Sequence, residues 1–167
     1  MRDNLHGRNF KHKLRFRRRF FELLEGRLYS ERLKEIRKKE NISVETLMAI
    51  YALGEEFYNR FLMKEAEVIF TAYMALCPHD HRGPGSLASI YLEQGKFNKA
   101  LEMLNIVKVY PTADFDETIL NIALCHYKLK EHNNAAVMLI LVKRDNLNEY
   151  YSKRYDYLKR QLNPYLQ

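Results

Sequence analysis

Three alanines recur through the middle of the chain at an almost constant interval, and this spacing constrains the fold more than any other feature. Ala66 and Ala100 are 34 residues apart, and Ala135 follows Ala100 after 35 residues. A fixed period of roughly 20 to 50 residues is typical of solenoids, in which each period forms one small structural unit. Because one such unit cannot bury its own apolar face, about three of them must stack to form a stable core.

The residues around these alanines resemble the tetratricopeptide repeat, a pair of antiparallel helices joined by a tight turn. In residues 50–78, "IYALGEEFYNRFLMKEAEVIFTAYMALCP", the motif's small residue, aromatic residues, second-helix alanine and final proline stand at Gly54, Phe57, Ala66, Phe70 and Pro78. Residues 86–111 and 119–143 repeat the pattern, with Ala88 and Ala123 in place of the glycine. A small residue there lets the two helix axes approach, while large side chains fill the space beside it.

We therefore predict an all-α fold of three tetratricopeptide helix–turn–helix repeats, with one helix before them and one after. The repeats are expected over about residues 47–80, 81–114 and 116–147. Apolar residues at three- and four-residue steps predict an N-terminal helix over 20–40 and a C-terminal capping helix over about 148–162. Residues 20–167 would then form a single domain, because each repeat covers the apolar face of its neighbour.

Loops are expected at glycine-rich or polar stretches between and within the repeats. Gly95 is placed in the turn of the second repeat, and the polar residues 131–134 in the turn of the third. The segment "HRGPGS", residues 81–86, is expected to break the start of the second repeat's first helix.

The stretch "CPHDHRGPG", residues 77–85, raises the question of a metal site. It places Cys77, His79 and His81 at alternate positions. Metal ligands carried on a helix stand about four residues apart, and no other cluster in the sequence supplies an obvious fourth ligand. Pro78 also occupies the final proline position of the first repeat. We therefore predict a connecting turn and no metal.

Charge is divided unevenly along the chain, although the formal net charge is +7. Residues 1–40 carry 14 Lys and Arg against 6 Asp and Glu, a net charge of +8, whereas residues 41–142 carry 8 against 12, a net charge of −4. Residues 1–19 are expected to form a basic, flexible arm. Basic runs with interleaved aromatic residues also contact RNA, membrane surfaces or partner proteins, so these alternatives stay open for the arm.

No motif of a catalytic site occurs in the sequence. There is no glycine-rich phosphate loop, no Gly-x-Ser-x-Gly, no His-Glu-x-x-His and no Cys-x-x-Cys. Cys77 and Cys125 fit a reducing compartment, and Cys125 is expected to be buried and inert. No apolar run approaches the length of about 18 residues that spans a membrane. We predict no enzymatic activity, no cofactor, no small-molecule substrate and no transmembrane segment.

A stack of such repeats presents a concave groove lined by the first helix of each pair. Helical spacing predicts which side chains face it. The candidates for a peptide-binding groove are Met48, Tyr51, Glu55, Tyr58, Asn59, Ser89, Leu92, Leu120, Leu124 and Tyr127. The set lacks the cluster of Lys, Arg and Asn that binds acidic C-terminal peptides, and it is rich in tyrosine and leucine. It therefore favours an extended apolar segment as ligand.

Part of the chain resembles more closely the class II type III secretion chaperones, which serve translocator proteins in Gram-negative bacteria. The likeness lies in "YALG-x2-FY", "EA-x2-IF-x-A" and "L-x3-D" within residues 51–80, and in "ALCHYKLKEHNNA", residues 123–135. In that family three repeats follow an N-terminal helix that commonly mediates dimerisation, and the groove holds an extended Pro-x-Leu-x-Pro-like segment. By this resemblance Tyr51 and Tyr58 are groove tyrosines. The family's members are usually acidic, whereas this chain carries a basic arm.

The resemblance implies a cytoplasmic, non-catalytic protein that binds and shields a hydrophobic secretion substrate, and a homodimer formed through the N-terminal helix. Needle-subunit co-chaperones share the repeats but bind an amphipathic helix. A general tetratricopeptide adaptor that joins folded proteins is a second alternative. The third is an RNA-associated protein that acts through the basic arm, although the acidic middle argues against nucleic acid as the main partner.

Overall fold

The computed structural model describes Glu35 and residues 42–166 of the chain. Its contacts separate two units, Met1–Val44 and Glu45–Gln167, and the description below concerns the second. The basic arm over 1–19 and the N-terminal helix predicted over 20–40 lie outside the described residues, apart from Glu35, which is helical.

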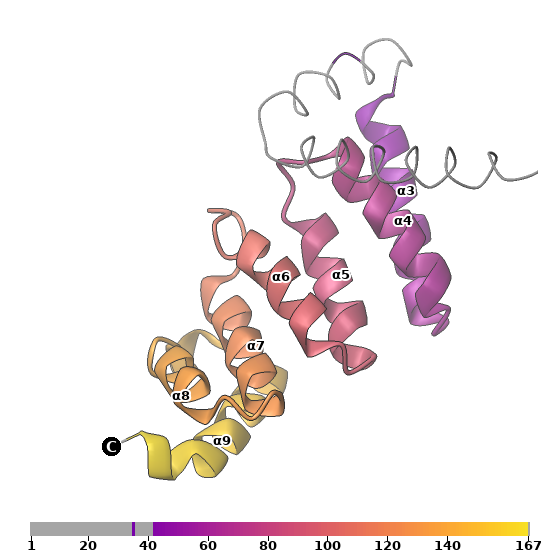
Figure 1. The fold of residues 1–167 in the computed structure, drawn as a ribbon. Helices are drawn as coiled ribbons and strands as arrows, with labels where there is room; N and C mark the ends of the chain where they lie inside the picture. Colours follow the sequence, from indigo (N-terminus) through magenta and orange to yellow (C-terminus); the bar gives the residue numbers. More distant parts are fainter. Residues whose placement is uncertain (1–34, 36–41, 167) are drawn as a thin grey trace, which may run out of the picture. The chain divides into compact units, whose positions relative to one another are not determined.

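Residues 42–166 are entirely helical apart from short connections, which confirms the predicted all-α class (Figure 1). Seven α-helices are described, and the first six form three consecutive pairs. The pairs are α3 (Val44–Asn59) with α4 (Met63–Leu76), α5 (Arg82–Glu93) with α6 (Phe97–Val107), and α7 (Phe115–Lys128) with α8 (His132–Ile140). The remaining elements are the short 3₁₀ helix η1 (Arg144–Asn146), α9 (Glu149–Leu162) and the 3₁₀ helix η2 (Asn163–Tyr165).

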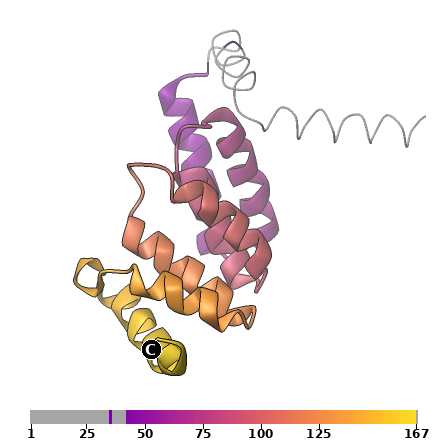
Figure 2. The same ribbon diagram turned by 60° about the vertical axis from the view of Figure 1, so that its left-hand side comes forward.

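The helices stack in chain order (Figure 2). One cluster of buried hydrophobic residues, drawn from α4 to α9, runs through the stack. Helix α4 packs on α5, α6 packs on α7, and α9 covers both α7 and α8. The repeat-defining residues Ala66, Ala100 and Ala135 are all fully buried. Opposite the first of them, a Cβ atom added to Gly54 would lie 2.6 Å from Cε1 of Phe70, so only glycine allows this helix contact. None of the described helices has the length and apolar character needed to cross a membrane.

All three pairs turn through the same backbone motif, which the sequence signalled in only one of them. Phe61, Gly95 and Lys130 adopt left-handed φ values of 58°, 68° and 67°. In each case the next residue's N–H donates to a carbonyl five residues earlier; these bonds are Leu62 to Phe57, Lys96 to Tyr91 and Glu131 to His126. This is the Schellman ending of an α-helix. The turn predicted over 131–134 is therefore wrong in position: α8 already begins at His132.

The segment over residues 81–86 does not break a helix, so that prediction is wrong. Helix α5 begins at Arg82, and Pro84 lies in its first turn, where a backbone N–H would have no partner in the helix. Gly83 is buried, and an added Cβ would lie 3.0 Å from Cβ of Met74 on α4. The glycine therefore permits close packing of α5 on α4 and does not mark a turn.

We expect Gly54→Ala to lower the free energy of unfolding by several kcal/mol, because the buried Phe70 ring blocks the new methyl group. Gly85→Ala is the matched control. It too lies within a helix, but its Cβ would meet nothing closer than a Val107 methyl at 4.0 Å. It should raise stability by up to about 1 kcal/mol through helix propensity. Urea unfolding measures both, and equal effects of the two substitutions would contradict the close helix contact.

Lys130→Gly should stabilise the protein by about 1 kcal/mol, because glycine adopts the left-handed conformation without the cost that a Cβ imposes. Lys128→Gly, two residues earlier at the last helical position of α7, should instead destabilise it by up to about 1 kcal/mol. Both lysines are exposed, so a difference between the two variants cannot come from lost side-chain packing. If the midpoint of thermal unfolding shifts in the same direction for both variants, the third repeat does not share the turn motif.

Candidate binding groove

Two adjoining cavities lie along the first helices of the repeats. One has a volume of about 320 Å³ and reaches from α3 across α5 to α7, and the other, of about 220 Å³, lies between α3 and α5. Both are lined by Tyr51, Ser86 and Ser89, so they form one continuous depression, here called the groove. Its length across three repeats suits an extended ligand better than a compact one.

Tyr51 forms the aromatic centre of the groove and is held from several sides. Its ring centroid lies 5.4 Å from that of Phe70 and 5.1 Å from that of Tyr73. Its hydroxyl lies 3.2 Å from Oγ of Ser86, and the Arg82 guanidinium lies 5.0 Å from the ring centroid. Burial raises the pKa of Tyr51. A ring fixed in this way loses little further freedom when a ligand binds.

The outer part of the α3 wall is formed by Glu55, Tyr58 and Asn59, which line the smaller cavity. Burial raises the pKa of Tyr58, and nearby Glu93, Tyr150 and Tyr151 raise it further. Tyr151 of α9 lines the larger cavity together with Tyr51, so aromatic side chains of α3 and α9 contribute to the same groove.

The floor of the groove is apolar in its centre. Leu92 of α5 and Leu104 and Val107 of α6 line the larger cavity. Gly85 leaves room above them, since an added Cβ would meet only Val107 within 4.0 Å. Ser86 and Ser89 supply hydroxyl groups beside this floor. The combination allows apolar side chains to be buried while a ligand backbone finds hydrogen-bond partners.

The α7 wall is polar. Asp114 is the N-cap of α7, and its Oδ1 accepts the backbone N–H of Glu117 at 2.8 Å. The Glu117 carboxylate accepts from Nδ2 of Asn148 at 3.1 Å. Asn121 accepts a hydrogen bond from the Arg154 guanidinium of α9. Burial raises the pKa of Glu117, and the neighbouring Asp114 carboxylate adds to this.

Six of the ten predicted groove residues line these cavities. They are Tyr51, Glu55, Tyr58, Asn59, Ser89 and Leu92. Met48 is 57% exposed but lines neither cavity. Three predicted residues of α7 also lie elsewhere, and they are Leu120, Leu124 and Tyr127.

The α7 prediction is wrong for Leu120, because this side chain packs into the hydrophobic core. Leu120 is fully buried in the core, and Leu124 packs against it. The Tyr127 ring lies edge-on to that of Tyr157, 6.2 Å between centroids, and its hydroxyl donates to Gln161 at 3.4 Å. The groove follows Glu117 and Asn121 instead.

Several groove residues escaped the sequence-based prediction. Ser86, Asn121 and Tyr151 line the larger cavity but were not among the candidates. Tyr151 belongs to the apolar stripe of the capping helix, so its burial was signalled by the sequence. The sequence did not indicate which side of α7 the capping helix would cover, because many packing angles bury the same apolar stripe.

A polar network beside the groove fixes the position of Arg82. The Asp80 carboxylate accepts from the Arg82 backbone N–H at 2.9 Å, from its Nη2 at 2.7 Å and from the Tyr73 hydroxyl at 2.7 Å. Burial alone would raise the pKa of Asp80, but the hydrogen bonds from Arg82 and Tyr73 outweigh it and lower the pKa to about 2. His81 is engaged with Thr112 at 2.8 Å. Within the described residues, no group of three His, Cys, Asp or Glu side chains could hold a metal ion.

Asp80 is expected to make stability depend on pH at the acid end. Its folded-state pKa lies below the ordinary value of 3.8, so its contribution is present above about pH 4 and is lost as the pH falls toward 2. We expect roughly 1–2 kcal/mol of unfolding free energy to disappear over this window in the parent, and much less in Asp80→Asn. Urea unfolding at pH 7, 4 and 2.5 provides the measurement. The control is Glu102→Gln, at an exposed position of α6. If both variants lose the same amount of unfolding free energy between pH 7 and 2.5, the Asp80 network does not cause the pH dependence.

Comparison with known proteins identifies the fold. No family model and no curated protein matches the sequence, but solved structures do. The type III secretion translocator chaperone SycD of Yersinia enterocolitica aligns with 77% of this chain and 96% of its own, at 19% identity and a TM-score of 0.62. SycD in complex with a peptide of the translocator YopD aligns over 75% and 92%, at 21% identity and a TM-score of 0.60.

A tetratricopeptide domain of another kind matches about as well. The domain of Sgt2 from Aspergillus fumigatus covers 72% of this chain and 81% of its own, at 14% identity and a TM-score of 0.61. These likenesses confirm the predicted tetratricopeptide fold and its resemblance to the translocator chaperones. The chain thus shares the fold of type III secretion translocator chaperones and of a fungal tetratricopeptide domain.

Proposed function

We propose that this protein is a chaperone that binds an extended, apolar segment of a secreted translocator-type protein in its groove. The observation that carries the proposal is the continuous groove itself, with the half-buried Tyr51 and Tyr58 on α3 and an apolar floor on α5 and α6. The SycD structure of similar fold, which is in complex with a translocator peptide, supports the same assignment.

The groove's chemistry fits a segment that must be shielded before export. Aromatic rings and the leucine–valine floor would bury apolar side chains of the client, which removes them from water. The hydroxyls of Ser86 and Ser89 lie beside them and can bond to client backbone groups. Binding to the unfolded client, and not to its assembled form, would keep it soluble by mass action.

The remaining features of the proposal follow from the resemblance to translocator chaperones. The protein would act in the cytoplasm of a Gram-negative bacterium, without catalysis, and would form a homodimer through residues 20–40. The state of Cys125 agrees with a non-catalytic role for this thiol. It is fully buried, and burial raises its pKa to about 12.

A general tetratricopeptide adaptor is the second candidate, and the likeness to the Sgt2 domain favours it. The TM-score of 0.61 for that domain is nearly the same as the 0.62 for SycD. An adaptor would recognise a folded partner that presents a flexible tail, whereas a chaperone would hold an aggregation-prone client. The difference lies in the partner and can be measured directly.

Affinity purification of the full chain from its native host, followed by mass spectrometry, separates the two. The bound material is washed at about 0.5 M salt, which screens exposed charges and so removes partners held only by them. A stoichiometric apolar secreted protein supports the chaperone. Folded cytoplasmic proteins point to the adaptor, and nucleic acid released by salt points to the basic arm.

We expect Tyr58→Ala to reduce client affinity by about tenfold or more, because interface tyrosines commonly contribute most of the binding free energy. Client affinity is measured by calorimetry. Before a purified client is at hand, the amount of client recovered by affinity purification is compared instead. Tyr165→Ala on η2, outside both cavities, is the matched control and should bind as the parent does. Thermal unfolding of both variants checks that they are folded. Unchanged affinity in folded Tyr58→Ala would place the client elsewhere.

A further inference from the structure

The charged side chains that line the groove are predominantly acidic. Glu55 lines its repeat-1 end, and Asp114 and Glu117 line its repeat-3 end. None of these three carboxylates forms an ion pair with a Lys or Arg of the described residues. Burial raises the pKa of Glu117, and the neighbouring Asp114 carboxylate raises it further, so a cation placed beside the two would be favoured.

The cations near the groove are already engaged. Arg82, which lines the larger cavity, pairs with Asp80 at 2.7 Å and donates to it through Nε as well. Arg154 lines neither cavity; its guanidinium stacks on the rings of Tyr150 and Tyr151 at 5.0 and 5.3 Å and donates to Asn121. Among the described residues, the carboxylates that line the groove thus lack an ion-pair partner, whereas Arg82, which also lines it, is paired with Asp80. Arg154, outside both cavities, is held in place by aromatic rings and the Asn121 amide.

This local charge is opposite to that of the whole chain. The net charge of +7 comes from the chain ends, whereas residues 41–142 carry 8 Lys and Arg against 12 Asp and Glu. Judged by its net charge, the protein would favour acidic partners. The side chains around the groove favour basic partners instead. Interactions at close range determine which charge is favoured at each position of a bound segment.

We propose that the groove selects apolar segments that carry a Lys or Arg beside their apolar residues, and discriminates against acidic ones. This inference rests on the proposed function, since it assumes that the groove is the client site. The apolar residues would occupy the floor at Leu92, Leu104 and Val107. The basic residue would lie toward Glu117 and Asp114, where it would pair with carboxylates that lack a cation.

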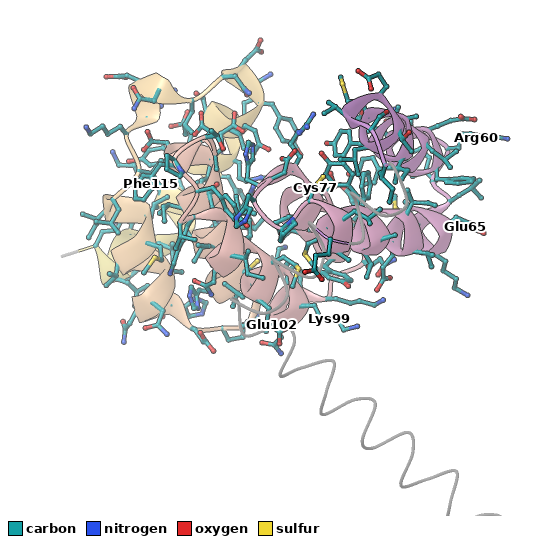
Figure 3. The ribbon with its side chains drawn as sticks, turned by 90° about the horizontal axis from the view of Figure 1, so that it is seen from above. Arg60, Glu65, Cys77, Lys99, Glu102 and Phe115 are labelled. Atoms are coloured by element: carbon teal, nitrogen blue, oxygen red, sulfur yellow. The ribbon has the colours of Figure 1, made fainter. Side chains whose placement is uncertain are left out.

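A display selection tests the inference without a known client. Random peptides of about 12 residues, long enough to span the groove when extended, are selected against the full-length protein. The selection is repeated on Glu55→Gln/Asp114→Asn/Glu117→Gln, whose amides keep the side-chain shape and, at position 114, the N-cap. The matched control is Glu65→Gln/Glu102→Gln/Asp145→Asn, which removes the same charge from exposed positions outside the groove. Glu65 and Glu102 point outward from α4 and α6 (Figure 3).

We expect apolar peptides enriched in Lys or Arg on the parent and on the control variant, with that enrichment lost on the groove variant. A selected peptide should bind the groove variant roughly three- to tenfold more weakly, and changing its Lys or Arg to Gln should have the same effect on the parent. The two losses should not add, because they remove one interaction.

The other outcomes separate this inference from the proposed function. Apolar peptides without a charge preference, or with acidic residues, would overturn the selectivity while the chaperone role stands. Absence of any peptide whose binding depends on Tyr58 would overturn both. Peptides that appear only after deletion of residues 1–19, a basic segment with interleaved apolar residues, would make that segment the occupant and would also overturn the proposal.

Discussion

The close approach of paired helices at small residues is the contact on which the rest of this structure depends. Gly54 meets the Phe70 ring, and in the next two repeats Ala88 and Ala123 occupy the equivalent buried positions. This packing sets the distance between helices in each pair. It thereby sets the spacing of α3, α5 and α7, along whose faces the groove runs.

The groove takes its final form from the helix that ends the stack. Helix α9 buries Leu158 and Leu162 fully in the core and contacts α7 through Arg154, Tyr157 and Gln161. This helix engages Tyr127 of α7 outside the groove and adds Tyr151 to the lining of the larger cavity. A helix required to close an open apolar end thus also shapes the candidate site.

Electrostatics divides the molecule in a way that composition conceals. The basic residues are concentrated at the chain ends, whereas the groove carries carboxylates without ionic partners. Arg82 is a cation that lines the groove, but its charge is paired with Asp80. Its planar guanidinium lies over the Tyr51 ring and supports it. Position and pairing, more than net charge, determine what such a surface attracts.

The sequence alone determined the helical class and the three repeats, because a 34-residue period and small-residue positions fix which faces meet. Helical spacing also placed four of the five α3 candidates, all except Met48, among the residues that line the cavities. It misread residues 81–86 as a break, since glycine and proline signal turns as strongly as they permit close packing in a first helical turn. It missed the left-handed turn residues Phe61 and Lys130, because such a residue is recognisable by type when it is glycine or asparagine and not when it is phenylalanine or lysine. Only the tertiary structure decided that Leu120 belongs to the core and Asn121 to the groove. The reason is that long-range packing determines which side of α7 is covered, and many packing angles bury the same apolar stripe.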